Sequence, residues 1–353
     1  MTVPTIGVGI LGCGPVTQAI HLPTLDRFSE TFHVARVMDV DPDVAKAVAG
    51  HAGSAWTTSA DELIADADVQ VVVICSPNQF HAEQVIAACR AGKKAVLAEK
   101  PLAVSREEAQ EIARVSAETG VPIVVGAMHT FDPGWLAATE NWADLIEKTH
   151  TIRYSIVLPP NPRFEDFATE ILPRVERTWP QQSAADRAAG MMFGNIMGLA
   201  IHDLPLVRMF CPDFRDIELL SAQTLSPGGY LVNLRIGDRS VQLYGHSTQS
   251  WRPEWRFEAI ADDQSLLVDF PNSYVHAGSA VATFRNGDES RTFGPYAANG
   301  YEAEWQYMAD LVAGTAEPLD LQVLIDDLVF ALTIADVATA EVRQNAEKTE
   351  VSA

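Results

Sequence analysis

The chain has 353 residues, of which 47% are hydrophobic and 20% are charged, and its formal net charge is -22. This length favours two domains over one compact core, and the composition is that of a globular protein. The acidic balance argues against binding to DNA, RNA or an anionic membrane surface, because their phosphate groups would be repelled.

Neither membrane insertion nor export is indicated. No apolar run approaches the ~18 residues of a membrane span, and the N-terminus enters the first predicted strand without a basic leader segment. The cysteines form no CxxC pair, so neither a zinc site nor a disulfide framework is predicted; they are Cys13, Cys75, Cys89 and Cys211. We expect a reduced cytoplasmic protein without a bound metal.

The first part of the chain alternates strand and helix. Apolar runs predict strands at 7–11, 33–39, 69–75, 95–97 and 122–126. Alanine-rich stretches predict helices at 41–49, 81–91 and 105–119. The strands are continuously apolar, which is typical of a parallel sheet covered on both faces. The pattern predicts a doubly wound α/β domain over residues 1–127.

The pattern changes after residue 128. The sequence predicts a strand at 151–158, then a proline-rich stretch and an apolar helix at 189–210. It predicts alternating strands over 217–293, and helices at 301–313 and 321–343. We expect an α+β domain over residues 128–353 with an open, mainly antiparallel sheet. One face of such a sheet needs cover, so it is the expected surface for oligomerisation.

The end of the first strand carries a chemical signal. Gly12 and Gly14 match the first two glycines of the dinucleotide fingerprint, and Thr17 stands where a third is common. Gly12 permits a tight turn. Gly14 permits a phosphate to approach the helix N-terminus that begins at Pro15 and Val16. A glycine turn between any strand and helix looks similar, so the strand–turn–helix context carries the prediction.

The second strand ends at Asp39, 25 positions after Gly14. A carboxylate there accepts hydrogen bonds from the adenine ribose hydroxyls and repels a 2′-phosphate. Neither Arg nor Lys follows within residues 40–43. The sequence therefore predicts NAD rather than NADP, and the alternative is a strand-end Asp that begins a turn.

Further motifs follow the glycine loop and the later strands: His21-Leu22-Pro23, Ser76-Pro77-Asn78 with His81 three residues on, and Glu99-Lys100-Pro101. Together they closely resemble the glucose–fructose oxidoreductase / inositol dehydrogenase / MocA-like family, over nearly the whole chain. The resemblance implies an N-terminal Rossmann domain and a C-terminal domain with an open sheet. It also implies hydride transfer between NAD(P) and a sugar or cyclitol hydroxyl, by a homodimer or homotetramer.

The resemblance also implies roles for individual residues. The cofactor would be contacted by Ser76, Pro77, Asn78, His81, Glu99 and Lys100. Glu99 would lie near the nicotinamide ribose, and Lys100 beside the reacting hydroxyl. A cation there stabilises a developing alkoxide, and a desolvated Lys relays the proton. The alternative for Lys100 is a surface side chain after a strand.

The family's second catalytic signature is an Asp followed four residues later by a His on one helix face. His202 matches the His, but Gly198 occupies the position of the Asp and Pro205 is not acidic. Asp203 is expected to point about 100° around the helix, which makes it a poor replacement. His202 is the second predicted catalytic residue and a substrate contact. Its alternative is a core histidine with one structural hydrogen bond.

The remaining substrate candidates are His129 and a group of arginines. His129 contacts cofactor or substrate, or it caps a strand; Thr130 stands in place of a family Arg. Arg163, Arg174 and Arg177 are candidates to clamp an anionic sugar through bidentate hydrogen bonds. Acidic residues share this stretch, so solvated ion pairs are the competing interpretation.

Three functions remain open on these grounds. The preferred one is an NAD-dependent dehydrogenase of a sugar or cyclitol, with Lys100 and His202 assisting proton transfer. The second is an oxidoreductive glycosidase acting on an anionic glycoside, such as a sulfonated or uronic sugar, by transient oxidation, elimination, hydration and re-reduction. The third is a non-catalytic sensor of NAD or sugar, against which the retention of Lys100 and His202 argues.

Overall fold

The computed structural model describes residues 5–142, 144–172, 182–248, 253–272, 274 and 277–352. The chain divides into two compact units. The first holds the described residues of Met1–Gly126, Phe164–Glu176 and Tyr301–Leu328. The second holds those of Ala127–Arg163, Arg177–Gly300 and Val329–Ala353. The first unit therefore includes segments from the middle and the end of the sequence.

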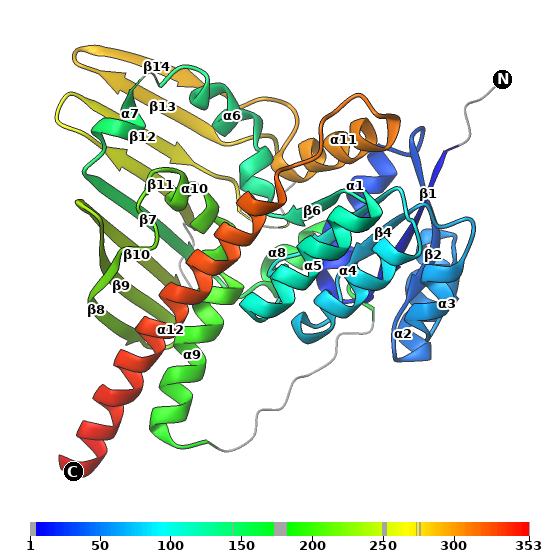
Figure 1. Ribbon diagram of the computed structural model, residues 1–353, viewed down its shortest axis with the longest axis horizontal. Helices are drawn as coiled ribbons and strands as arrows, with labels where there is room; N and C mark the ends of the chain where they lie inside the picture. Colours follow the sequence, from blue (N-terminus) through cyan, green and yellow to red (C-terminus); the bar gives the residue numbers. More distant parts are fainter. Residues whose placement is uncertain are drawn as a thin grey trace. The chain divides into compact units, whose positions relative to one another are not determined.

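The first unit is built on a six-stranded parallel sheet in the order β3-β2-β1-β4-β5-β6 (Figure 1). The strands are β1 Ile6–Leu11, β2 Phe32–Met38, β3 Ala55–Thr57, β4 Val71–Ile74, β5 Ala95–Glu99 and β6 Ile123–Gly126. This is the strand order of a dinucleotide-binding Rossmann fold, and the predicted doubly wound parallel sheet is confirmed. The short edge strand β3 was not predicted, because two of its three residues are exposed and it forms no apolar run.

Helices connect these strands: a π-helical turn at Thr17–His21, α1 Leu22–Arg27, α2 Pro42–Ala52, α3 Ala60–Ala65, α4 His81–Arg90 and α5 Arg106–Thr119. Their ends follow local signals. Asp41, Ser59 and Ser105 accept hydrogen bonds from backbone N–H groups in the first turns of α2, α3 and α5. Gly53 and Gly120 end α2 and α5 in the left-handed conformation.

The second unit is built on an eight-stranded sheet in the order β14-β13-β12-β11-β7-β10-β9-β8. The strands are β7 Thr151–Leu158, β8 Ile217–Leu225, β9 Gly229–Ile236, β10 Arg239–Ser247, β11 Glu254–Ile260, β12 Gln264–Asp269, β13 Val281–Asn286 and β14 Glu289–Phe293. The predicted open, mainly antiparallel sheet is confirmed. One pair, β7 with β10, is parallel; parallel neighbours need a long crossover, and the chain between these strands supplies one.

The remaining helices are α6 Pro133–Thr139, α7 Leu145–Lys148, α8 Pro162–Ala168, α9 Ala184–Gly198, α10 Leu204–Met209, α11 Gly300–Ala313 and α12 Leu321–Ser352. In the second unit α9 and α12 lie side by side (Figure 1), joined by an ion pair between Arg343 and Asp186. On one face of its central strands the side chains are buried, and several of them are aromatic, among them Tyr154, Tyr230 and Trp255.

The single helix predicted at 189–210 is wrong. Helix α9 ends at Gly198, a 3₁₀ turn follows at Ala200–His202, and α10 starts anew at Leu204. Pro205 lies in the first turn of α10, where its missing N–H costs nothing, whereas inside a continuous helix it would break a hydrogen bond. His202 and Asp203 therefore do not share the face geometry of one helix.

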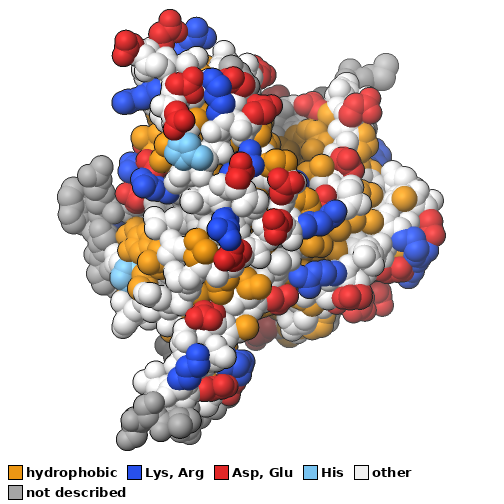
Figure 2. All heavy atoms as spheres, turned by 60° about the vertical axis from the view of Figure 1, so that its left-hand side comes forward, with side chains coloured by type: hydrophobic (Ala, Val, Ile, Leu, Met, Phe, Trp, Pro, Cys, Tyr) orange, Lys and Arg blue, Asp and Glu red, His pale blue; other side chains and the backbone are white. Residues whose placement is uncertain are grey.

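The opposite face of the eight-stranded sheet is polar. Arg256 pairs with Asp269 across β11 and β12, and Arg235 pairs with Glu218 across β8 and β9. Acidic and basic side chains are interspersed on the side of the molecule shown in Figure 2. The homodimer or homotetramer stays a prediction. Within the described ranges, no helix is long and apolar enough to cross a membrane.

Candidate active site

The predicted cofactor residues follow neighbouring strands of the six-stranded sheet. Asp39 follows β2, Gly12 follows β1, Ser76 follows β4, and Glu99 ends β5. All these strands are parallel, so these residues lie along one carboxyl edge, which is where open α/β sheets bind their ligands. With strands about 4.8 Å apart, the edge from β2 to β5 is about 14 Å long, which suits an extended dinucleotide.

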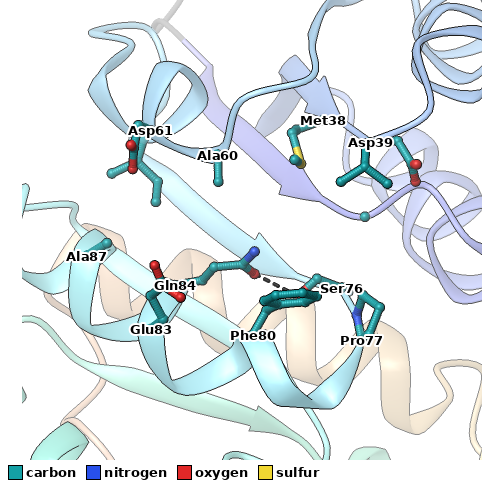
Figure 3. A pocket seen from close by; sticks show the side chains of 13 residues that line it. Met38, Asp39, Ala60, Asp61, Ser76, Pro77, Phe80, Glu83, Gln84 and Ala87 are labelled. Atoms are coloured by element: carbon teal, nitrogen blue, oxygen red, sulfur yellow. Dashed lines mark hydrogen bonds between the residues drawn. The ribbon is translucent and has the colours of Figure 1, made fainter.

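A cavity of about 380 Å³ opens at the β2 end of this edge (Figure 3). Gly12, Asp39, Ser76 and Pro77 line it, as the cofactor prediction requires. Sequence reasoning missed its other lining residues, which are Met38, Val40, Ala60, Asp61, Ile64, Phe80, Glu83, Gln84 and Ala87. Phe80, Gln84 and Ala87 are spaced by four and three positions, which is typical of one helix face. That spacing could have predicted these three residues from the sequence.

The charges lining this cavity are all acidic. Asp39, Asp61 and Glu83 are its charged lining residues, and the others are apolar or neutral. Figure 3 shows Ser76 beside Gln84, whose Oε1 accepts the Ser76 hydroxyl at 2.7 Å. A cavity of this composition suits an adenosine with free ribose hydroxyls and disfavours a 2′-phosphate.

The glycine turn is built as the fingerprint requires. Gly12 has φ +92, and a Cβ there would lie 2.6 Å from the Cys75 carbonyl oxygen, so no other residue fits without displacement. No heavy atom lies within 4 Å of a Cβ built at Gly14, which leaves the loop open to a ligand. Pro15 and Val16 begin the helical turn that follows.

Asp39 combines the two functions considered for it. Its Oδ2 accepts the Cys13 backbone N–H at 2.9 Å, and its Oδ1 accepts that of Asp41 at 3.0 Å. The carboxylate therefore anchors the glycine loop and starts the turn into α2, while it also lines the cavity.

At the β5 end of the edge, Glu99 is buried and bonded to His21. Nε2 of His21 lies 3.1 Å from Oε1 of Glu99, and the indole N–H of Trp305 donates to Nδ1 of His21 at 3.3 Å. Since Nδ1 accepts, the His21 proton lies on Nε2 and points at Glu99. Burial alone would raise the pKa of Glu99, but the hydrogen bond from His21 and the charge of His21, followed by the charges of Lys100 and His81, hold it below its usual range.

Lys100 follows Glu99 directly, and its backbone N–H donates to Glu99 Oε2 at 3.3 Å. Desolvation lowers the pKa of the Lys100 ammonium, and the Glu99 carboxylate opposes that shift. A lysine in this state exchanges a proton more readily than a solvated one.

A second carboxyl group, Glu304 of α11, is buried in the same unit with 1% of its surface exposed. Its Oε1 has no hydrogen-bond partner in the described part of the chain. Burial, and then the charge of Glu99, raise the pKa of Glu304 well above its usual range.

The two remaining predicted cofactor residues lie differently. The ring nitrogens of His81 lie 2.7 Å from the Pro101 carbonyl oxygen and 2.8 Å from that of Ser76. His81 thus joins the loops that follow β4 and β5, and it does not line the cavity. Asn78 is exposed in a 3₁₀ turn at Asn78–Phe80.

In the second unit, His129 is bonded to a carboxylate that sequence reasoning had dismissed. Its Nδ1 lies 2.5 Å from Oδ1 of Asp203, and the Trp255 indole N–H donates to Asp203 Oδ2 at 2.5 Å. The ring of His202 packs edge-on against Trp255, with centroids 5.5 Å apart. Helix α9 ends at Gly198, so Asp203 lies beyond the end of that helix, where it bonds to His129 and Trp255.

Of the three arginine candidates, the structure describes only Arg163. Arg163 is exposed on α8, whereas Arg174 and Arg177 lie outside the described residues. The described ranges also contain no group of His, Cys, Asp and Glu arranged to hold a metal ion.

Comparison with known proteins identifies the first unit. Residues 6–127 match the model of the GFO_IDH_MocA family, described as an oxidoreductase family with an NAD-binding Rossmann fold. The match shows that the N-terminal part of the chain is similar to this family. The glycine loop, Asp39 and the cavity at the carboxyl edge are thus parts of an NAD-binding Rossmann domain.

Curated relatives match part of the chain. The chain is 38% identical to inositol 2-dehydrogenase 3 of Saccharopolyspora erythraea over 132 residues, which is 37% of this chain and 38% of that protein. It is 34% identical to inositol 2-dehydrogenase of Rhizobium meliloti over 133 residues, covering 38% and 39% of the two chains. The match therefore spans well under half the length of these relatives.

Solved structures resemble the whole chain at low identity. A 3-ketoreductase from Actinomadura kijaniata in complex with NADP and TDP-benzene superposes with a TM-score of 0.70 at 18% identity, covering 96% of this chain and 98% of that one. UDP-N-acetylglucosamine 3-dehydrogenase from Acidithiobacillus ferrooxidans superposes with a TM-score of 0.73 at 17% identity, covering 96% and 100%. These likenesses establish the fold of both units.

The two glycines of the loop should respond differently to alanine. Gly12→Ala should lower the free energy of unfolding by on the order of 2–5 kcal/mol, since the Cβ strains the backbone and meets the Cys75 carbonyl. Gly14→Ala should change stability by less than ~0.5 kcal/mol but weaken NADH binding by ~10-fold or more. Urea unfolding and NADH fluorescence measure both effects; equal stability losses would contradict this account.

Glu304 should make stability depend on pH. Because the pKa of Glu304 is raised in the folded state, the folded chain keeps the Glu304 proton at pH values where the unfolded chain has lost it. The contribution of Glu304 to the free energy of unfolding therefore falls as pH rises above the pKa of Glu304 in the unfolded chain. Glu304→Gln should therefore gain stability relative to wild type between pH ~4.5 and 8, measured by urea unfolding at several pH values. As a control, Glu302→Gln on the same helix should lose stability at neutral pH, because Glu302 pairs with Arg27. A constant offset for Glu304→Gln would argue against a protonated Glu304.

Proposed function

We propose that the chain is an NAD-dependent oxidoreductase that transfers a hydride between nicotinamide and a hydroxyl group of a sugar or cyclitol. The observation that carries the proposal is the row of Asp39, Gly12, Ser76 and Glu99–Lys100 along one carboxyl edge. A cavity suited to adenosine lies at one end of this edge, and the desolvated Lys100 lies at the other. The names of the inositol dehydrogenase relatives support the substrate class.

The chain's residues account for binding and for the proton. Gly12, Gly14 and the helical turn after them would hold the pyrophosphate, and Asp39 the adenine ribose. Bound NAD supplies the ring that accepts or returns the hydride. Lys100 stabilises the developing alkoxide and passes its proton on, with Glu99 fixed beside it by His21. His202 assists proton transfer in the proposed reaction.

The preference for NAD follows from the acidic cavity. Asp39, Asp61 and Glu83 would repel a 2′-phosphate, although the Actinomadura 3-ketoreductase was solved with NADP. We therefore expect this chain to prefer NAD, although it shares the fold of a protein that was solved with NADP.

The activity is tested with the full chain, NAD and a panel of free polyols: myo-inositol, glucose, glucuronate and a 6-sulfonated glucose. Net NADH formation with a panel member supports the dehydrogenase. The charged members test whether Arg163, Arg174 and Arg177 favour an anionic sugar. Nitrophenyl glycosides of the same sugars test the glycosidase: nitrophenol release that requires NAD but forms no net NADH would replace the proposal by that alternative.

Cofactor preference should change when a cation is added beside Asp39. Val40 is 81% exposed and lines the same cavity. Val40→Arg should raise NADPH affinity by ~10-fold or more, since an Arg pairs with the 2′-phosphate, and leave NADH affinity within ~3-fold. Fluorescence titration measures both; Val40→Gln, which adds length without charge, is the control. Stronger binding of NADPH than NADH by the wild type would refute the preference.

Removal of the Lys100 ammonium should slow chemistry more than binding. Lys100→Met should lower kcat by on the order of 10²–10⁴-fold with the best polyol, while the Kd for NADH stays within ~3-fold. Lys94, exposed near the other end of β5, provides the matched control, and Lys94→Met should retain full kcat. A kcat for Lys100→Met within ~3-fold of wild type would remove Lys100 from the reaction.

A further inference from the structure

One buried side chain of the first unit bonds both to the glycine loop and to a segment 154 positions later in the sequence. Gln18, 7% exposed, lies in the π-helical turn at Thr17–His21 that follows the loop. Its Nε2 donates to the carbonyl oxygen of Cys13 at 2.8 Å and to that of Leu172 at 3.2 Å. Its Oε1 accepts the Leu172 N–H at 2.9 Å. Both N–H groups and the oxygen of the carboxamide are therefore used.

The same turn holds the carbonyl groups of the glycine loop. The Thr17 hydroxyl donates to the Gly12 carbonyl oxygen at 2.6 Å. The backbone N–H of Gln18 donates to the Gly14 carbonyl oxygen at 3.1 Å. Together with the carboxamide bond to Cys13, every carbonyl oxygen of the loop accepts a hydrogen bond from one of these two residues. The loop conformation that is to receive the pyrophosphate therefore depends on Gln18.

The distant segment is Phe164–Leu172, which we call the strap and which belongs to the first unit. Its last residues pack on the helices α1 and α2 of that unit. Thr169 and Leu172 line a cavity of about 20 Å³ together with Leu22 of α1 and Val48 of α2. This space holds about one water molecule, so the strap lies closely against the two helices.

Few buried side chains hold the strap in place. Among its residues whose side chains the structure describes, those that are buried are Phe164, Glu165 and Ile171, while Leu172 is 47% exposed. A short segment with so few buried apolar side chains opens at a lower free energy than the strands of a sheet. The bonds between the Gln18 carboxamide and the Leu172 backbone are therefore important for docking its end.

We propose that Gln18 is a positioning residue that couples NAD binding at the glycine loop to docking of the strap. NAD that lies on the loop stabilises the conformation in which the Cys13 carbonyl meets Gln18, and that conformation presents the carboxamide to Leu172. By linkage, docking of the strap raises NAD affinity by the factor by which NAD favours docking. All the groups involved belong to one unit. The proposal rests on the NAD binding of the proposed function and is independent of the substrate.

The coupling is tested with the full-length chain and NADH. Gln18→Met keeps the volume of the side chain and removes its three hydrogen bonds, to Cys13 and to Leu172. The Kd for NADH should rise by ~10-fold or more in this variant. Leu172→Pro removes the N–H that Gln18 accepts and leaves the loop unchanged, so the Kd should rise by ~5-fold or more. Fluorescence titration measures both.

Hydrogen exchange measured by mass spectrometry reports on the strap itself. In the wild type, saturating NADH should slow the exchange of peptides that cover Phe164–Leu172 several-fold. In Gln18→Met the same peptides should exchange fast with and without NADH. A purely structural Gln18 would give faster exchange in the variant but no effect of NADH on the wild-type strap, and that result would overturn the coupling.

Gln70→Met is the matched control. The Gln70 side chain also bonds to the first strand, where it accepts the Gly7 N–H at 3.3 Å, but at the amino end of β1, away from the glycine loop. This variant should keep the Kd for NADH within ~3-fold and retain the response of the strap. Equal weakening by Gln70→Met and Gln18→Met would reduce the effect to general stability and overturn the proposal. If Gln18→Met does not fold, Leu172→Pro carries the comparison.

The outcomes distinguish this coupling from the proposed function. If NADH binds but the strap exchanges at the same rate with and without it, the coupling fails and NAD binding stands. If NADH slows the exchange but no polyol is oxidised, the dehydrogenase function is what has failed. A wild type that binds no NADH would refute both.

Discussion

A charged carboxylate inside a protein must be hydrogen-bonded, and this requirement organises both units of the chain. Glu99 in the first unit and Asp203 in the second are both buried, and each is bonded to a histidine. In both cases a tryptophan indole completes the arrangement: Trp305 donates to His21, and Trp255 donates to Asp203 itself. The local backbone follows this requirement, with a π-helical turn at Thr17–His21 and a helix break before Asp203.

The two arrangements have different chemical consequences. In the first, the indole fixes His21 as a donor, so the histidine serves the carboxylate and keeps Glu99 charged beside Lys100. In the second, Asp203 accepts from His129 on one carboxylate oxygen and from Trp255 on the other. The same components thus hold a buried carboxylate in each unit, through one ring donor in the first and two in the second.

The parts of the fold governed by local pattern could be predicted from the sequence. The continuous apolar strands and the glycine turn gave the parallel sheet and the edge where Gly12, Asp39 and Ser76 lie. Asp203 could not be placed, because its direction depends on a helix break that an apolar run does not reveal. Trp305 could not be placed beside His21 either, since 284 positions separate them in the sequence. Phe80 and Gln84 were within reach, because their spacing marks one helix face.

The first unit is assembled from chain segments that are synthesised at different times. Its sheet is complete by residue 126, but the unit also includes Phe164–Leu172, where Gln18 bonds to the backbone of Leu172, and the α11 helix that carries Trp305. A ribosome that has released only the first 127 residues has therefore produced a sheet whose His21 lacks its indole cover. The buried Glu99–His21 pair reaches its final environment only when α11, which carries Trp305, has emerged.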